Sequence, residues 1–169
     1  MEHSILITPL NNGHSAEIIA LILPIQQIEF GVPVTLQQQQ DLLDIEKHYS
    51  GTGGNFWGAY ADGLLVGTIG LIAVGHEAGV IRKMFVRKEF RGKKYRIAQQ
   101  LLETLLIFCG HEGIEALYLG TVEILKAAHR FYERNGFRRI EAAKLPSYFP
   151  RMQVDNVFYQ LAIESKVDR

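Results

Sequence analysis

The sequence predicts one mixed α/β (α+β) domain over residues 1–169. Three observations support this prediction. The chain has 169 residues, 47% of them hydrophobic, which is enough for one well-packed core and short for two. Segments with apolar residues at helical spacing alternate with short segments rich in β-branched and aromatic residues. No linker and no internal repeat divides the chain.

Charge and cysteine content narrow the class of protein. The 18 basic and 18 acidic side chains balance, which argues against nucleic-acid binding over the whole surface. The single cysteine, Cys109, cannot form an internal disulfide and suits a reducing compartment. The sequence starts without a signal-peptide pattern, and no segment approaches the roughly 18 apolar residues of a membrane span. We therefore expect a cytoplasmic protein that does not enter a membrane.

The first third of the chain reads as a strand followed by two helices. Residues 5–10 form the expected strand. Ser15 is the expected cap of a helix whose isoleucines recur at helical spacing, and Pro24 should kink that helix or end its regular part. After a turn over residues 29–35, residues 36–49 read as a second helix.

The middle of the chain changes to a strand pattern. Residues 56–61 and 64–74 should form a hairpin, because Asp62-Gly63 between them is a strong signal for a tight turn. A second turn over residues 75–79 leads into a third strand over residues 80–86. The three strands predict an antiparallel meander.

The last part alternates helices and strands. A helix follows Arg96 and should end at Gly110; its core face is formed by Ile97, Leu101, Leu102, Leu105, Phe108 and Cys109. Then come a strand over residues 116–121 and a helix over residues 124–136 that Gly136 closes. The final strands, residues 137–143 and 156–163, flank a loop rich in proline and aromatic residues.

A dense basic stretch lies in front of the helix that follows Arg96. Eight of the 18 Lys and Arg residues fall between Arg82 and Arg96, with Glu89 as the only acid among them. A strand, a basic loop with a glycine and a helix N-terminus together favour an anion, because the first N–H groups of a helix point outward at the positive end of its dipole. A compact ligand such as a pyrophosphate would suit this arrangement. A solvated basic face and a nucleic-acid patch remain the alternatives.

Four segments of the sequence resemble the GNAT superfamily of acetyl-CoA-dependent acetyltransferases. They are VRKEFRGK (86–93), IAQQLLETL (97–105), LYLGT (117–121) and AAHRFYERNGF (127–137), within a resemblance that runs from about Phe56 to Ile140. The resemblance implies a mixed, mostly antiparallel central sheet with helices on both faces. It also implies acetyl-CoA as co-substrate, bound where two central strands splay.

The phosphate-binding loop of the family reads Q/R-x-x-G-x-G/A. The preferred register places Lys93 at the Q/R position, Arg96 at the first glycine and Ala98 at the last small residue; counting from Arg91 instead would place Lys94 and Arg96 at both glycines. Arginine takes a backbone with positive φ only at a cost, and Leu125 is a second departure, where many members have asparagine. The resemblance implies these cofactor-binding residues: Met84, Phe85, Val86, Arg91, Gly92, Lys93, Lys94, Tyr95, Arg96, Ile97 and Ala98.

The resemblance also assigns roles in catalysis. The backbone N–H groups at Met84, Phe85 and Val86 would engage the pantetheine arm and the acetyl carbonyl, and Tyr132 would protonate the departing sulfur. The sequence leaves the general base open, with Glu29 as our choice and with His76, Glu77 and His129 as the other candidates. His129 reads more simply as a surface residue, and Cys109 as a buried thiol. No Cys/His cluster indicates a metal site.

The predicted function is acetyl transfer from acetyl-CoA to an amine of a small molecule or peptide, by direct attack in a ternary complex. The alternatives are a non-catalytic acyl-CoA sensor, an O-acetyltransferase and, disfavoured by the neutral charge, a nucleic-acid-binding module. The acceptor walls should come from the two N-terminal helices and from residues 144–155, where Tyr148 and Phe149 suggest an aromatic lining. A homodimer is left open.

Overall fold

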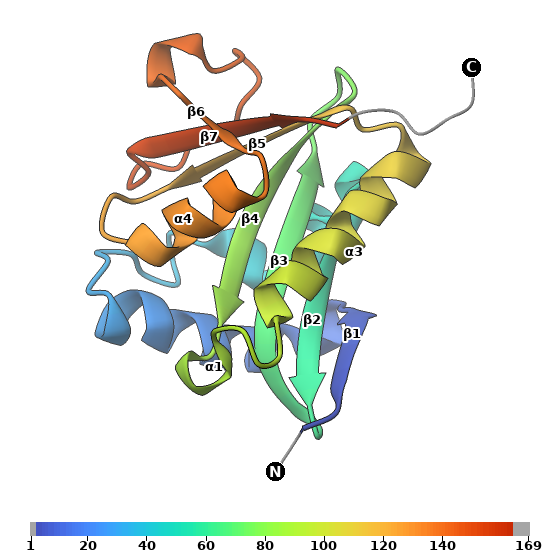
Figure 1. The fold of residues 1–169 in the computed structure, drawn as a ribbon, viewed down its shortest axis with the longest axis vertical. Coiled ribbons are helices and arrows are strands. Elements are labelled where there is room, and N and C mark those ends of the chain that lie inside the picture. The colour runs from blue at the N-terminus through green and yellow to red at the C-terminus, as the bar shows by residue number, and fades with distance from the viewer. Residues whose placement is uncertain (1–2, 164–169) are drawn as a thin grey trace.

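A computed structural model describes residues 3–163 of the chain. Its strands form a single seven-stranded sheet in the order β1-β2-β3-β4-β5-β7-β6, in which only β4 and β5 run parallel (Figure 1). The mixed, mostly antiparallel sheet is therefore confirmed. The strands are β1 (Ile5–Pro9), β2 (Asn55–Ala61), β3 (Leu64–Ala73), β4 (Ala78–Val86), β5 (Ala116–Thr121), β6 (Arg138–Ile140) and β7 (Val157–Ala162).

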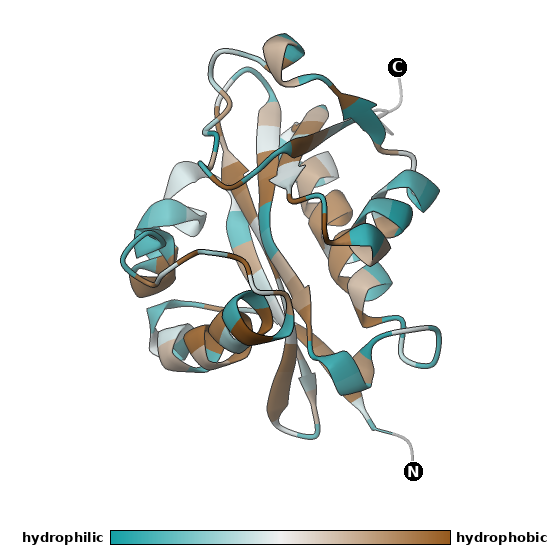
Figure 2. Cartoon of the chain, turned by 90° about the vertical axis from the view of Figure 1, so that its left-hand side faces the viewer, coloured by the Kyte–Doolittle hydropathy of each residue, from teal (hydrophilic) through white to brown (hydrophobic). Residues whose placement is uncertain are grey.

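Helices cover both faces of this sheet, as expected. The helices are α1 (Ser15–Pro24), α2 (Ile45–His48), α3 (Ile97–Glu112) and α4 (Lys126–Arg134). Figure 2 shows the sheet edge-on between two helical layers, with α3 and α4 on one side and the N-terminal helices on the other. Two separate apolar cores result, because α3 buries Leu101 and Leu105 on one face while α1 buries Ile18 and Ile22 on the other. Within residues 3–163, no helix combines the length and apolarity needed to cross a bilayer.

The central meander forms as the turn chemistry dictates. Asp62 and Gly63 both have positive φ, 49° and 88°, which is the backbone of the tight hairpin turn that joins β2 to β3. On β4, the register against β3 shifts near Lys83, whose φ is 57°. The Thr68 hydroxyl donates a hydrogen bond of 2.7 Å to the Lys83 carbonyl at this irregularity. Such a bulge re-aims the side chains beside it.

The two parallel strands separate soon after they meet. Only Ala78–Val80 of β4 pair with β5, at Ala116–Tyr118, whereas β5 continues along β7 as far as Thr121. From Ile81 onward, β4 therefore has β3 on one side and no strand on the other. This open edge positions the site described below.

Two details of the N-terminal helices differ from the sequence prediction. The expected helix over residues 36–49 is wrong: a 3-10 turn (Gln40–Leu43) and the short α2 replace it, separated at Asp44. The Asp44 carboxylate accepts a hydrogen bond of 3.1 Å from the Lys47 amide, and this capping competes with a continuous helix. Ser15 is not a cap but the first residue of α1, because Asn11 caps the preceding turn.

Glycine and proline set the helix ends, though not always where expected. The prediction for Pro24 is confirmed: regular α1 ends there and continues as a π-helical turn (Ile25–Glu29). Helix α3 does not end at Gly110; it reaches Glu112, because Gly113 supplies the left-handed residue, with φ 73°. Gly136, with φ 89°, closes α4 as predicted. The strand expected over 137–143 is shorter, since a 3-10 turn follows Ile140.

Candidate active site

The N-terminus of α3 and the loop before it form an exposed cationic end of the site. Arg96 precedes the first helical residue with φ 52° and ψ 42°, a left-handed conformation that glycine adopts more easily than other residues. This geometry agrees with the register that begins at Lys93. No described side chain caps the helix, so its first N–H groups are available to an anion. The side chains of Lys93, Lys94 and Arg96 are all exposed there.

Arg91 has a different partner from the one the sequence suggested. Its guanidinium contacts both oxygens of Glu29, at 2.5 and 2.7 Å, and its Nε donates a 2.7 Å hydrogen bond to the Val86 carbonyl. It also lies over the Phe30 ring, 5.5 Å from its centroid. Arg91 therefore ties the turn after α1 to the end of β4, and its charge is neutralised by a carboxylate.

The same ion pair speaks against Glu29 as the base. The hydrogen bond from Arg91 is the largest influence on this carboxyl and lowers its pKa, which weakens Glu29 as a proton acceptor. Glu29 also lies outside the cavity described below. The structure thus keeps Glu29 near the end of β4 but commits it to a structural contact.

The resemblance implied backbone donors at Met84, Phe85 and Val86. The open edge of β4 presents such donors at two of these three residues. The Arg87 amide donates a 2.7 Å hydrogen bond to the Val66 carbonyl of β3, and Phe85 pairs with Thr68. Since residues of an antiparallel pair alternate between facing the partner and facing away, the amides of Met84 and Val86 face the gap toward β5. The Phe85 amide faces β3, and only its side chain reaches the site.

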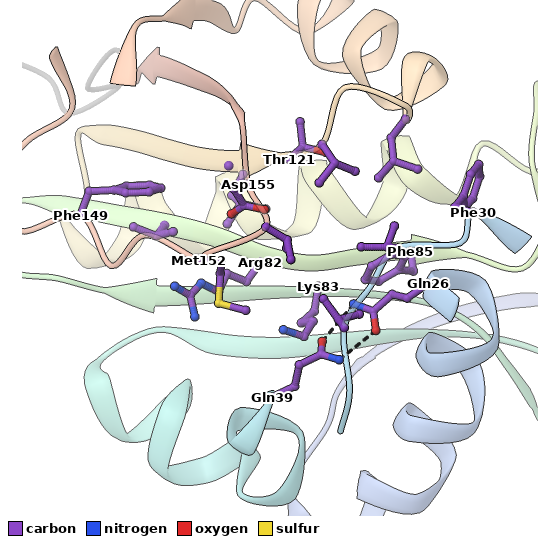
Figure 3. Close-up of a pocket in the computed structure, with 18 residues that line it drawn as sticks. Gln26, Phe30, Gln39, Arg82, Lys83, Phe85, Thr121, Phe149, Met152 and Asp155 are labelled. Carbon is purple, nitrogen blue, oxygen red and sulfur yellow. Dashed lines mark hydrogen bonds between the residues drawn. The ribbon is translucent and has the colours of Figure 1, made fainter. Parts of the chain in front are cut away.

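A cavity of about 110 Å³ lies where β4 and β5 separate (Figure 3). Its walls come from four parts of the chain: residues 26–39 after α1, residues 80–85 of β4, residues 120–125 at the end of β5, and residues 149–155 before β7. Gln26 and Gln39 close one side through paired amide hydrogen bonds of 2.9 and 3.0 Å. The acceptor walls were predicted in the two N-terminal helices and in residues 144–155. The loop does contribute to this lining, whereas the N-terminal share comes from residues 26–39, between α1 and α2.

A buried ion pair supports one wall of the cavity. Lys83, turned inward at the β4 bulge, places its Nζ 3.2 Å from Oδ2 of Asp41, and the Tyr49 hydroxyl donates a 2.5 Å hydrogen bond to the same oxygen. Burial opposes ionisation of Asp41, but Lys83 and Tyr49 outweigh it and lower the pKa of the carboxyl. Burial lowers the pKa of Lys83. The two charges compensate each other within the protein.

Asp155 is a cavity residue that sequence reasoning missed. It is the only acid in the lining, and burial raises the pKa of its carboxyl to about 6, although Arg82, Lys83 and Arg151 act in the opposite direction. Neighbouring Arg82 donates a hydrogen bond to the Pro150 carbonyl, which holds this loop against β4. The available signal in the sequence was the position of Asp155, as the one acid of the 144–155 loop.

Tyr132 lies on α4 behind the open edge of β4. Its ring is buried between Phe137 and Tyr159, with centroid distances of 5.5 and 5.8 Å. Its hydroxyl lies 3.7 Å from the Met84 sulfur, a weak acceptor. Burial raises the pKa of Tyr132 well above its usual value, so the hydroxyl keeps its proton at neutral pH.

The remaining candidate bases lie away from the cavity. His76 and Glu77 occupy the turn between β3 and β4, where the His76 ring stacks on Tyr148 at 4.1 Å. His129 is buried, contrary to the expected surface position, and its Nε2 lies 3.0 Å from the Val122 carbonyl. Cys109 is a buried free thiol as predicted, and burial raises its pKa to about 12. Among residues 3–163, no group of three or more His, Cys, Asp or Glu is placed to hold a metal ion.

Comparisons with known proteins agree with this architecture. Residues 19–137 match the model of the acetyltransferase (GNAT) family. The chain is 34% identical over 112 residues to a probable N-acetyltransferase camello of Xenopus tropicalis, covering 64% of this chain and 50% of the relative. It is 35% identical over 126 residues to an N-acetylaspartate synthetase of Danio rerio, covering 72% and 44%. The chain thus spans about half the length of the curated relatives it matches.

A solved structure is similar over nearly the whole chain. This is an acetyltransferase of the GNAT family from Staphylococcus aureus Mu50, with a TM-score of 0.91 and 38% sequence identity. The match covers 95% of this chain and 100% of that one. The likeness therefore extends beyond the family model, which ends at residue 137, to the loop before β7 and to β7 itself.

Proposed function

Because the chain belongs to the acetyltransferase (GNAT) family, we propose that it transfers the acetyl group of acetyl-CoA to the amine of a small-molecule or peptide acceptor, by direct attack within a ternary complex. The observation that carries this proposal is the open edge of β4. It has an exposed anion site at one end and a small cavity at the other, with a buried, protonated tyrosine behind it.

The residues at the open edge fit acetyl-CoA by their chemistry. Lys93, Lys94 and Arg96, with the first amides of α3, would hold the pyrophosphate. The amides of Met84 and Val86 face the gap in which the pantetheine arm would lie, where a backbone donor would stabilise negative charge on the acetyl oxygen. When bound, acetyl-CoA supplies an activated thioester. Tyr132 would donate a proton to the leaving sulfur.

Charge in the cavity favours an acceptor amine that also carries a carboxylate. Arg82 lines the cavity, and no carboxylate of residues 3–163 forms an ion pair with it. A planar guanidinium is well suited to a carboxylate. The name of the Danio rerio relative, N-acetylaspartate synthetase, describes an acceptor of this class. We also place the protein in the cytoplasm, on the strength of its unpaired thiol.

Two measurements test the proposed function. First, release of free CoA from acetyl-CoA should require an acceptor in a panel of free amino acids, simple primary amines and short peptides, with the amino acids turned over fastest. Second, CoA should raise the melting temperature of the protein while pantetheine raises it much less, because the phosphate end supplies most of the affinity. Equal protection by both ligands would contradict the assigned phosphate site, and CoA binding without turnover of any acceptor would favour a sensor.

A further inference from the structure

The cavity holds an acid for which the described structure provides no partner. Apart from Asp155, the charged residues in the lining are Arg82 and Lys83. The Asp155 carboxylate accepts no hydrogen bond and forms no ion pair with any residue in the range 3–163, whereas the nearby acids Glu29 and Asp41 are both paired, with Arg91 and Lys83. A carboxylate that faces a cavity without a partner is available to a ligand.

The backbone around Asp155 fixes its position. The Asp155 amide donates to the Met152 carbonyl at 3.2 Å, and the next amide, of Asn156, donates to the Thr121 carbonyl of β5 at 2.9 Å. The Asn156 side chain accepts a 3.0 Å hydrogen bond from the Glu123 amide. These bonds clamp the segment to the end of β5, so Asp155 is held at the mouth of the β4–β5 gap.

Gly120 allows this close approach. A Cβ atom built on Gly120 would lie only 2.5 Å from Oδ2 of Asp155, closer than real contacts permit. Any other residue at this position of β5 would therefore displace the carboxylate. The absence of a side chain at Gly120 is thus tied directly to the placement of the acid.

The charged and titratable groups around Asp155 come from each element packed against it. Arg82 and Lys83 approach from β4, Arg151 from its own loop and Tyr132 from α4. The cations partly offset the burial, which leaves the carboxyl with a pKa near 6, close to the value that suits a general base at neutral pH.

We infer that Asp155 is the general base of the reaction: it receives the ammonium group of the acceptor at the mouth of the β4–β5 gap and removes its proton. This inference rests on the proposed function. The freed lone pair of nitrogen forms the N–C bond as the thioester C–S bond breaks. Of the two protons that nitrogen loses, Asp155 takes one and passes it to solvent. The other replaces the proton that Tyr132 gives to sulfur, so that free CoA and the N-acetyl product result.

The first test needs no acceptor. Carbon-13 NMR of the side-chain carboxyls in the free protein should show one aspartate signal that titrates near pH 6 and that disappears in Asp155→Asn. This substitution preserves shape and removes a partly buried charge that forms no ion pair with a described residue, so the variant should fold. If Asp155 titrates near the usual aspartate value of about 3.9, the carboxyl is not poised as a base and the inference is overturned, whatever the outcome of the activity screen.

The second test uses the best acceptor from the panel. In the wild type, kcat/KM for the acceptor should fall below about pH 6, because the base is protonated there. Asp155→Asn should lower kcat about 10²–10⁴-fold, remove this acidic limb and leave the KM for acetyl-CoA nearly unchanged. Glu29→Gln is the matched control, the same chemical change outside the cavity, and should retain the limb.

A wild type without turnover would contradict the proposed function. An active wild type whose limb survives in Asp155→Asn would overturn the role of Asp155 alone.

Discussion

The two ends of the open β4 edge are built in opposite ways. The proposed phosphate end is one continuous segment, from Lys93 to Ala98, and its three cations are exposed. The cavity end collects residues from four distant parts of the chain, and its lysine is buried against an aspartate. Exposed charges act singly and weakly, because water screens them. A charge buried in the cavity needs an opposite charge beside it, and one without such a partner can contact a ligand.

The largest expected effect is at Tyr132, which lies between the two ends. Tyr132→Phe removes the proton donor and keeps the ring in its aromatic cluster. We expect kcat to fall on the order of 10²–10⁴-fold, with the KM for acetyl-CoA within a few-fold. Stability should change little, because the hydroxyl contacts only a thioether. Tyr159→Phe, which changes a neighbouring tyrosine, is the control and should keep turnover near wild type in steady-state assays.

Normal turnover of Tyr132→Phe with an acceptor for which chemistry is rate-limiting would remove Tyr132 from the mechanism. The proton on sulfur would then come from water or from the ammonium of the acceptor.

The next prediction compares the cost in stability of breaking a buried ion pair with that of breaking exposed ion pairs. Asp41→Asn leaves Lys83 buried without its anion, and should lower the free energy of unfolding by about 3 kcal/mol. Glu123→Gln changes an exposed acid that pairs with Lys126 and Arg139, and should lower the free energy of unfolding much less. Urea denaturation of both variants measures the difference. Equal costs would show that pairing at the cavity end is no stronger than at the surface.

Substitutions at the proposed phosphate end should change the affinity for acetyl-CoA rather than the rate of the chemical step. The double variant Lys93→Ala/Arg96→Ala should raise the KM for acetyl-CoA about tenfold, or about 1.4 kcal/mol. The kcat should stay nearly unchanged, because the proposed contacts would be the same in the ground state and the transition state. Lys126→Ala/Arg139→Ala removes two exposed cations elsewhere and should leave KM unchanged. A loss confined to kcat would place Lys93 and Arg96 in the chemistry instead.

The smallest effect concerns the backbone of Arg96. Arg96→Gly relieves a left-handed conformation that is costly for a residue with a Cβ, and should stabilise the protein by up to about 1 kcal/mol after the larger chain entropy of glycine is subtracted. The KM for acetyl-CoA should rise less than in the double variant, since Lys93 remains. A melting temperature below that of the wild type would show that the Arg96 side chain contributes packing that offsets its backbone strain.

Local sequence was sufficient for much of the fold. The Asp62-Gly63 turn, the meander and the core face of α3 depend on neighbouring residues and on apolar spacing, and all three formed as predicted. The helix expected over residues 36–49 failed because one carboxylate, at Asp44, makes a capping bond that apolar spacing does not reveal. The end of α3 shifted from Gly110 to Gly113 for a similar reason, since both glycines are permitted to end a helix.

The family resemblance in the sequence by itself determined the GNAT fold, because short contiguous motifs carry it. The role of Tyr132 and the register of the phosphate loop, inferred from the same motifs, stay predictions. Only the tertiary structure decided which carboxylate is free. Nothing along the chain shows which of Glu29, Asp41 and Asp155 is paired, yet folding brings Arg91 to the first and Lys83 to the second and leaves the third facing the cavity. The physical reason is that the basicity of a carboxylate is set by burial and by its neighbours in space. Here Arg91 lies 62 residues from Glu29, Lys83 lies 42 from Asp41 and Arg82 lies 73 from Asp155 along the chain.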